Sequence, residues 1–250
     1  MTQNVLSTEA LGKRYGGLVV TDNVHLAIAP GELHAVIGPN GAGKSTLINQ
    51  LSGEIAPDSG KILYEGQDIT GLLIHQRARN GLLRSYQITS IFEDFTVREN
   101  VVLAALGARE HAFRFWEAML RRTQFARQAD EVLQVTGLAA NVDTLAHDLS
   151  YGGRRQLELA MALAARPTML LLDEPMAGMS VQESAAVVSL LQNLKRRYTI
   201  LLVEHDMDAV FALADRITVL VYGKIIFTGT PEQVRSHPEV RAAYLGDATH

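Results

Sequence analysis

The sequence predicts an α/β fold: a parallel sheet flanked by helices, with an antiparallel β part at the N-terminus and a helical subdomain. Three observations indicate this fold. After residue 150, short apolar segments alternate with helical segments, as expected for parallel strands covered on both faces. One earlier apolar segment, Leu33–Ile37, leads into a glycine-rich loop that a helical pattern follows. The chain has 250 residues, enough to bury a large core without disulfides or metals.

Composition excludes several other classes of protein. Hydrophobic residues are 47% and charged residues 20% of the chain, and the net charge of −4 does not suit a general nucleic-acid or membrane binder. The absence of cysteine excludes disulfides, zinc thiolate sites and cysteine nucleophiles. Apolar stretches such as Val101–Ala108 are far shorter than the about 20 residues of a spanning helix. Met1–Asn4 does not resemble the start of a signal peptide. We therefore expect a cytosolic protein, unless a partner holds it at a membrane.

The first part of the chain is predicted to be rich in β-strands. Apolar side chains alternate with others over Val24–Ile28, which is the period of a half-buried strand. Turns are expected at Pro30–Glu32 and Pro57–Gly60, and each precedes a strand pattern, at Leu33–Ile37 and Lys61–Glu65. The antiparallel β part is therefore placed here.

The middle of the chain is predicted to be helical. From Val97 to about Gly137 turn signals are few, and apolar residues recur at the spacing of one helix face. That face is formed by Phe125, Ala129, Val132 and Leu133. Gly137 is expected to stop the helix. This segment is the candidate helical subdomain.

Helices and strands alternate after Ser150. Helices are predicted at Arg154–Ala165, Gln182–Arg197 and Met207–Ala214. Strands are predicted at Met169–Leu172, Thr199–Val203 and Ile217–Val221. Gly223 and Gly229 bracket a hairpin-like segment, and a short helix is expected from Pro231.

A phosphate-binding loop follows the strand pattern Leu33–Ile37. The motif G-x-x-x-x-G-K-[ST] is matched at every fixed position by Gly38, Pro39, Asn40, Gly41, Ala42, Gly43, Lys44, Ser45 and Thr46. Glycines let backbone N–H groups point at phosphate oxygens, and a helix starting near Gly43 adds its positive dipole end. Lys44 would give a charge to the outer phosphates, and the Ser45 hydroxyl would ligate Mg²⁺. An accidental glycine-rich turn is disfavoured by the strand before it and the helix after it. The sequence therefore predicts a P-loop NTPase core that binds ATP with Mg²⁺.

Two carboxylates, Asp173 and Glu174, end the apolar run Met169–Leu172. Asp173 is expected to hold Mg²⁺ through its water shell, and Glu174 to orient or deprotonate the attacking water. Taken alone, the pair fits a strand that ends in solvated acids. Behind a phosphate loop in an α/β pattern, ATP hydrolysis is the favoured interpretation.

Between these elements lies a third motif, the segment Leu149–Gln156, which opens a helix. In this order, the three resemble the ATP-binding subunits of ABC transporters, whose signature is Leu-Ser-Gly-Gly-Gln, and the resemblance covers nearly the whole chain. It implies the ABC ATPase fold and a dimer in which Ser150 and Gly152 bind the γ-phosphate of ATP held by the other subunit. It also implies a single ABC ATP-binding domain over 1–250, with a nucleotide-binding core at about 1–96 and 150–230, a helical subdomain at 97–149 and a tail at 231–250.

The resemblance gives roles to three more residues. Tyr15 matches the aromatic residue that stacks on adenine, Gln87 the glutamine that contacts Mg²⁺ and faces the transmembrane partner, and His205 the switch histidine that reads the γ-phosphate. Taken singly, Tyr15 also fits a packed surface aromatic, Gln87 a solvated polar residue, and His205 a neighbour of a helix cap. Their joint occurrence in the family's order favours the functional roles. The expected catalytic residues are Glu174, His205, Lys44 and Gln87, and the expected Mg²⁺ ligands are Ser45, Gln87 and Asp173.

Three positions depart from the family's pattern. Tyr151 stands where the signature usually has glycine, and Gly153 where it has glutamine. Ser180 stands where aspartate is common. A serine can hydrogen-bond across a dimer but carries no charge, so the coupling between two ATP sites is left open.

A finer resemblance is to the uptake transporters for branched-chain amino acids. It rests on the tyrosine in the signature, on Gly178 after Ala177, on Gly81–Gln87 and on the tail Pro238–Gly246. The broader group includes importers of urea and aromatic compounds. The ATPase of the lipopolysaccharide exporter has a similar tail, but its glutamine usually follows Leu-Pro, which is absent here.

These resemblances imply an ATP-hydrolysing subunit of an importer. The expected partners are a second ATP-binding subunit (identical or paralogous), transmembrane permease subunits and, indirectly, a solute-binding protein, with no nucleic acid. The expected location is the cytoplasmic face of the inner membrane. The alternatives are the ATPase of a lipopolysaccharide-type exporter, a soluble non-transport ATPase and a nucleotide-binding scaffold.

The segment Arg109–Arg127 combines arginines with aromatic residues. It fits a contact with lipid headgroups beside the membrane partner. An ordinary amphipathic helix with a solvated basic face fits better.

Overall fold

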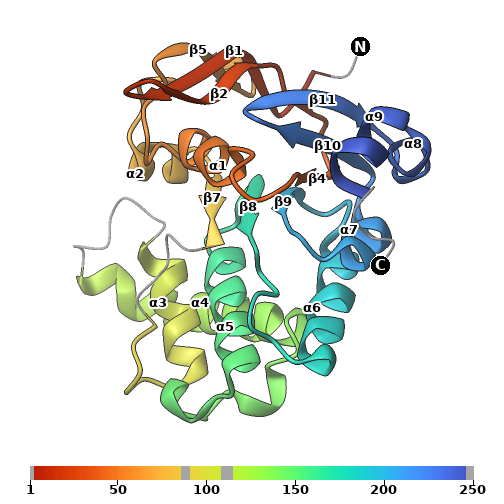
Figure 1. The fold of residues 1–250 in the computed structure, drawn as a ribbon. Helices are drawn as coiled ribbons and strands as arrows, with labels where there is room; N and C mark the ends of the chain where they lie inside the picture. The colour runs from red at the N-terminus through yellow and green to blue at the C-terminus, as the bar shows by residue number, and fades with distance from the viewer. Residues whose placement is uncertain (1–2, 86–90, 108–114, 246–250) are drawn as a thin grey trace. The chain divides into compact units, whose positions relative to one another are not determined.

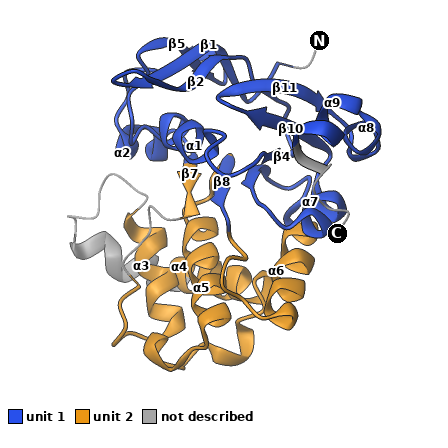
Figure 2. Ribbon diagram, in the orientation of Figure 1, with its two compact units in different colours: residues 1–82, 169–174, 194–250 blue, residues 83–168, 175–193 orange. Residues whose placement is uncertain are grey.

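The structure, a computed structural model, describes residues 3–85, 91–107 and 115–245, without the side chains of 115–123, 244 and 245. The chain divides into two compact units (Figure 2). Unit 1 comprises residues 1–82, 169–174 and 194–250, and unit 2 comprises 83–168 and 175–193.

Unit 1 contains the predicted antiparallel β part (Figure 1). Its strands are β1 (Leu6–Tyr15), β2 (Leu18–Val24), β3 (Ala27–Ile28), β5 (Ser59–Tyr64) and β6 (Gln67–Asp68). They run in the order β2-β1-β5-β6, with β3 also paired to β1, and these pairs are antiparallel. The long strand β1 was not predicted, and the alternating segment Val24–Ile28 is not one strand: β2 ends at Val24 and β3 covers only Ala27–Ile28.

The second sheet is mainly parallel, as predicted. Its strands are β4 (Leu33–Ile37), β7 (Leu82–Arg84), β8 (Met169–Asp173), β9 (Thr199–Val203), β10 (Arg216–Val221) and β11 (Lys224–Gly229). The order is β11-β10-β4-β9-β8-β7. Strand β4 lies parallel between β10 and β9, and β8 lies parallel to β9, whereas β11 returns antiparallel to β10. Every residue of β4 and β9 is buried, which explains their unbroken apolar character.

Helices of unit 1 follow its strands. They are α1 (Lys44–Ser52), α2 (Ile74–Arg79), α7 (Met207–Leu213), α8 (Pro231–Ser236) and α9 (Pro238–Val240). Helix α8 begins at the predicted Pro231. Leu47, Ile48 and Leu51 of α1 pack into a core with both sheets. This packing fixes the start of α1 at the end of β4.

Unit 2 is the helical part of the chain. It contains α3 (Val97–Gly107), α4 (Phe115–Val135), α5 (Tyr151–Ala164), most of α6 (Val181–Leu194) and short 3₁₀ turns at Ala139–Asn141 and Ala146–Asp148. Its core joins Val101, Phe125 and Leu157 from three helices. Gly137, with a φ of +77°, follows the end of α4 as predicted.

The structure bears on one of two expectations about membranes, the lack of a spanning helix, and leaves the other, the role of the arginine and aromatic segment, untested. Among the described residues, no helix is long and apolar enough to cross a membrane. The arginine and aromatic segment falls on residues 109–114, outside the described part, and on the backbone of α4, whose side chains up to 123 are not described. Both interpretations of that segment stay predictions.

Candidate functional site

The predicted phosphate loop joins β4 to α1 within unit 1. The first bond of α1 runs from the Leu47 N–H to the Gly43 carbonyl at 2.9 Å. The amides of Lys44, Ser45 and Thr46 therefore precede the helical ladder, where backbone N–H groups have no acceptor within the helix. Such amides, at the positive end of the helix dipole, form a binding site for an anion.

Glycines are required in this loop for reasons visible in its surroundings. A methyl group at Gly38 would overlap the Leu220 carbonyl oxygen, and one at Gly43 would overlap that of Val20. Gly41 has a φ of +78°, and a methyl group there would meet nothing within 4 Å. The loop is thus held tightly by neighbouring backbone on one side and is open at Gly41, as a phosphate cradle requires.

Lys44 is bonded to the loop and interacts electrostatically with the acidic pair. Its Nζ donates to the carbonyls of Gly38 at 2.7 Å and Pro39 at 3.0 Å. Burial lowers the pKa of Lys44, and the charges of Glu174 and Asp173 oppose that shift. The ammonium is therefore held inside the loop and lies in the field of both carboxylates.

The acidic pair stands at the carboxyl end of β8. Asp173 is the last residue of the strand, paired in register with Val203 of β9. Glu174 follows with a φ of 46°, unusual for a residue other than glycine, and its N–H donates to the Val203 carbonyl at 2.8 Å. Backbone conformations of this kind are concentrated at functional sites.

His205 faces the same carboxylate. Its Nδ1 lies 3.8 Å from Glu174 Oε1 and 3.7 Å from Glu204 Oε2. Glu204 is buried, and its Oε2 accepts from the N–H groups of His205 and Asp206 at 2.9 and 3.3 Å. Glu204, which sequence reasoning missed, thus fixes the turn that presents His205. Its only sequence signal is a position just after an apolar strand.

Two of the three expected Mg²⁺ ligands belong to unit 1. Ser45 is exposed in the first turn of α1, and Asp173 is half-buried. A hydroxyl and a carboxylate are ligands that suit Mg²⁺, which keeps waters and binds substrate phosphates as well. Gln87 lies outside the described residues. In the described part of the chain, no cluster of His, Asp and Glu could hold a metal by itself.

Tyr15, the expected adenine contact, is the last residue of β1. Its side chain is 50% exposed, and Lys13 Nζ lies 5.6 Å from the centre of its ring. An exposed ring is available to stack on a base, and its role stays a prediction.

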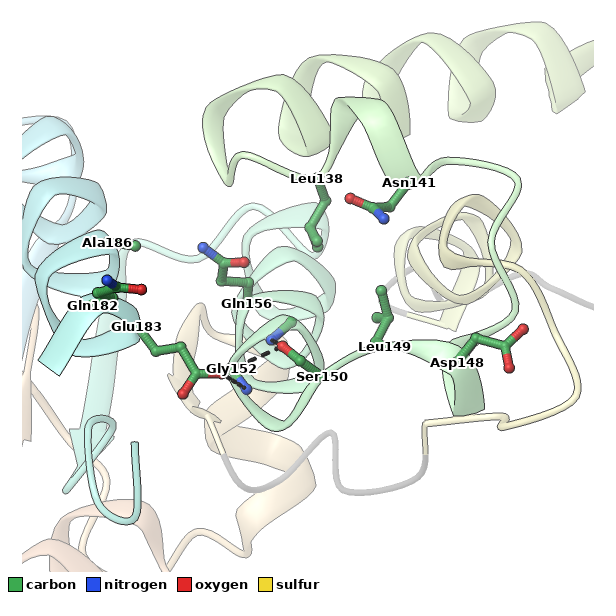
Figure 3. A pocket seen from close by; sticks show the side chains of 11 residues that line it. Leu138, Asn141, Asp148, Leu149, Ser150, Gly152, Gln156, Gln182, Glu183 and Ala186 are labelled. Atoms are coloured by element: carbon green, nitrogen blue, oxygen red, sulfur yellow. Dashed lines mark hydrogen bonds between the residues drawn. The ribbon is translucent and has the colours of Figure 1, made fainter. Parts of the chain in front are cut away.

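The signature residues lie in unit 2, at the start of α5. Ser150 caps the helix, because its Oγ accepts from the Gly153 N–H at 3.1 Å. Its hydroxyl donates to Glu183 Oε1 at 3.3 Å, and the Gly152 N–H donates to the same oxygen at 3.0 Å (Figure 3). Glu183 was not predicted to be here. The spacing of Ser180 and Glu183 suggests a helix cap, but no sequence pattern links them to residues 150–152.

The departures at Tyr151 and Ser180 make contacts within unit 2. The Tyr151 hydroxyl donates to the Ala177 carbonyl at 3.3 Å, and its ring lies beside Gly178. The Ser180 hydroxyl and N–H donate to Glu183 Oε2 at 2.8 and 3.0 Å. Tyr151 therefore joins α5 to the segment before α6, and Ser180 binds the glutamate of α6 that also contacts the start of α5.

Family models match two parts of the chain. One described as "ABC transporter" matches residues 21–177. Another, described as "Branched-chain amino acid ATP-binding cassette transporter", matches residues 224–250. The first spans the phosphate loop, the signature and the acidic pair.

Individual proteins are similar over nearly the full length. The chain is 38% identical to the high-affinity branched-chain amino acid transport ATP-binding protein LivG of Escherichia coli (strain K12), covering 99% of this chain and 100% of the relative. It is 36% identical to the lipopolysaccharide export system ATP-binding protein LptB of Haemophilus influenzae, covering 98% of each. A solved structure, the ADP conformation of an ATP-binding cassette of an ABC transporter, has a TM-score of 0.83 at 28% identity and covers 98% of this chain and 100% of that one.

Proposed function

The chain belongs to the ABC transporter family as an ATP-binding subunit, and from this premise we propose that it hydrolyses ATP to power the uptake of a branched-chain amino acid or a related small solute. The observation that carries the catalytic part is the pairing of Glu174 with His205 in the unit that holds the phosphate loop. The solute class is supported by the similarity to LivG and by the family model matched at the tail.

Substrate binding is assigned to the loop and to Lys44. The amides at the start of α1 would contact phosphate oxygens, and Lys44 would exchange its bonds to the Gly38 and Pro39 carbonyls for bonds to the outer phosphates. Tyr15 would stack on the adenine. The expected contacts of the loop involve Gly38, Pro39, Asn40, Gly41, Ala42, Gly43, Lys44, Ser45 and Thr46.

The hydrolytic step is assigned to Glu174. Its carboxylate would take a proton of the attacking water as the water oxygen bonds to the γ-phosphorus and the bond from that phosphorus to the β–γ bridging oxygen breaks, which releases ADP and inorganic phosphate. His205, whose Nδ1 lies within 3.8 Å of that carboxylate, would contact the γ-phosphate and orient the base. Ser45, Asp173 and Gln87 would hold Mg²⁺, which, when bound, neutralises phosphate charge.

The remaining machinery is supplied by partners. ABC ATP-binding cassettes work as dimers with transmembrane permease subunits. A second ATP-binding subunit, identical or paralogous, would place its ATP against Ser150 and Gly152 of this chain. The permease would hold the subunit at the cytoplasmic face of the inner membrane, and a solute-binding protein would deliver the solute.

Export of a lipopolysaccharide is the second candidate, favoured by the 36% identity to LptB over nearly the whole chain. Cells that lack this chain separate the two functions. Under the uptake proposal they lose accumulation of labelled branched-chain amino acids, and the wild-type chain restores it while Glu174→Gln does not. Normal uptake together with lipopolysaccharide retained inside the cell would contradict import and support export.

A further inference from the structure

One carboxylate oxygen occupies both donors that the signature is expected to offer to ATP. Glu183 Oε1 accepts from the Ser150 hydroxyl at 3.3 Å and from the Gly152 N–H at 3.0 Å. A carboxylate and a phosphate both need such donors, and the positive end of α5 favours either anion. Figure 3 shows the Glu183 side chain reaching from α6 to the start of α5.

The carboxylate is fixed from its other side as well. Glu183 Oε2 accepts from the Ser180 hydroxyl at 2.8 Å and from the Ser180 N–H at 3.0 Å. Hydrogen bonds from the Ser180 N–H and hydroxyl, and then from Gly152 and Ser150, lower the pKa of Glu183. The side chain is therefore ionised near neutral pH and bonded at both oxygens.

The sequence around Glu183 accommodates this arrangement. A methyl group at Gly152 would lie 2.6 Å from Glu183 Oε1, so glycine allows the carboxylate to come close. An ionised aspartate at position 180 could not donate to Glu183, because its side chain only accepts hydrogen bonds. Ser180 instead supplies a hydroxyl donor. The departure at this position is thus suited to a glutamate three residues later.

An arriving phosphate cannot share these donors with Glu183. Two anions at one helix start repel each other, and the Ser150 hydroxyl has a single proton to donate. The carboxylate has room to leave, because it borders a cavity of about 430 Å³ within unit 2 (Figure 3). The amide side chains of Asn141, Gln156 and Gln182 line that cavity and can donate hydrogen bonds.

We propose that Glu183 is an internal clasp on the signature: it holds Ser150 and Gly152 in the unpaired subunit and is displaced by the outer phosphate of ATP bound to a second copy of this chain. The inference rests on the shared ATP site of the proposed function. The clasp opposes pairing until ATP is present, because its bonds must be broken before the signature can take the phosphate.

The test measures pairing of the whole chain in the Glu174→Gln background, in which ATP-bound dimers are expected to accumulate. Sedimentation at increasing protein concentration with saturating ATP gives the dimer dissociation constant. Glu183→Ala removes the clasp and should lower this constant by at least about tenfold, because the two hydrogen bonds from Ser150 and Gly152 to Glu183 no longer have to be broken. Glu183→Gln keeps the size of the side chain and removes its charge, so a smaller decrease is expected.

A matched control separates the clasp from the helix cap that Glu183 also forms. Glu99 belongs to a similar cap at the start of α3, where its Oε2 accepts from the Thr96 N–H and hydroxyl at 2.8 and 2.9 Å. Glu99→Ala should lower the melting temperature as Glu183→Ala does, and should leave the dimer dissociation constant unchanged. If the alanine variant does not fold, the dimer dissociation constant of Glu183→Gln provides the test.

The measured dimer dissociation constants either support the clasp or overturn it. A constant that is unchanged or raised in both Glu183 variants overturns the clasp, while dimerisation of the Glu174→Gln parent still supports the proposed function. Dimerisation of the Glu183 variants alone supports the clasp in its strongest form. If no variant pairs with ATP, the shared site between copies is wrong and the clasp falls with it.

Discussion

Glu174 and His205 meet at the carboxyl ends of neighbouring parallel strands, with Glu174 Oε1 3.8 Å from His205 Nδ1. The contact depends on two local features: the φ of 46° at Glu174, and the buried carboxylate of Glu204, which binds the His205 N–H. The parallel pairing of β8 with β9 brings residues about thirty positions apart into one place, because parallel strands end at the same edge of a sheet. The parallel sheet thereby positions the proposed base, Glu174, next to His205.

The first prediction concerns this base. Glu174→Gln keeps the size of the side chain but cannot accept the water proton, so ATP turnover should fall by about 10²–10⁴-fold. Phosphate release at saturating ATP measures the loss, and calorimetric ATP binding, expected to persist, is the control. Turnover within a few-fold of the wild type would show that Glu174 is not the base.

The second prediction concerns acid stability. Glu32 is buried beside His34, whose Nδ1 lies 2.7 Å from Glu32 Oε1. Burial alone raises the pKa of Glu32, but hydrogen bonds from His34 and the Ala29 N–H, with the charges of His34 and Arg216, outweigh it and leave the pKa below its ordinary value of 4.5. A lowered pKa contributes stability above the ordinary value, and that contribution is lost as the pH falls through the lower folded-state pKa.

Glu32→Gln should therefore reduce the steepness with which stability falls below pH 4.5. At neutral pH the variant should be less stable by about 1–2 kcal/mol, since bonds to a charged acceptor are weakened. Urea unfolding at several pH values measures both effects. Equal steepness in the variant and the wild type would assign the acid sensitivity to other groups.

The third prediction concerns the adenine contact. Tyr15→Ala should weaken ATP binding by roughly 1–3 kcal/mol, the range for stacking between a base and an aromatic ring. Tyr15→Phe is the matched control and should bind almost as well as the wild type, since the ring is retained. A large loss in the phenylalanine variant would instead indicate a hydrogen bond from the hydroxyl. Unchanged affinity in both variants would place the adenine elsewhere.

The sequence predicts a strand well when all of its residues lie in the same apolar environment. The strand Thr199–Val203 has the predicted bounds, because every residue in it is buried. Strand β1 was missed because Ser7, Glu9 and Lys13 interrupt its apolar pattern. It is extended because β2, β3 and β5 all pair with it, and such pairing depends on distant residues.

In the candidate site, too, the sequence predicts local motifs but not contacts between residues that are distant along the chain. The phosphate loop is a local motif, so the sequence predicts it together with the helix that starts at Lys44. The contact between Gly152 and Glu183 joins residues 31 positions apart, and it depends on how α5 and α6 pack. Local patterns identify the helix cap at Ser180 but not the carboxylate's second set of partners.

The last prediction concerns how two subunits share their ATP sites. Ser150→Arg fills the start of α5 with a long cationic side chain and removes a cap of about 1 kcal/mol. If the signature acts on ATP bound to the other subunit, this variant should neither pair nor hydrolyse, yet its monomer should bind ATP almost as the wild type does. Lys44→Ala, in unit 1, should lose ATP affinity in the monomer, because it removes the charge that would meet the outer phosphates.

Mixing the two inactive variants distinguishes a shared site from a site within one chain. A mixed dimer has one ATP site with both lesions and one site with neither, since each site takes its phosphate loop from one chain and its signature from the other. Hydrolysis should therefore return in part in the mixture, and phosphate release at varied ratios should peak near equal amounts. If Ser150→Arg abolishes ATP binding by its own monomer, the signature acts within one chain and the shared site is wrong, because a lesion across the dimer cannot affect an unpaired subunit.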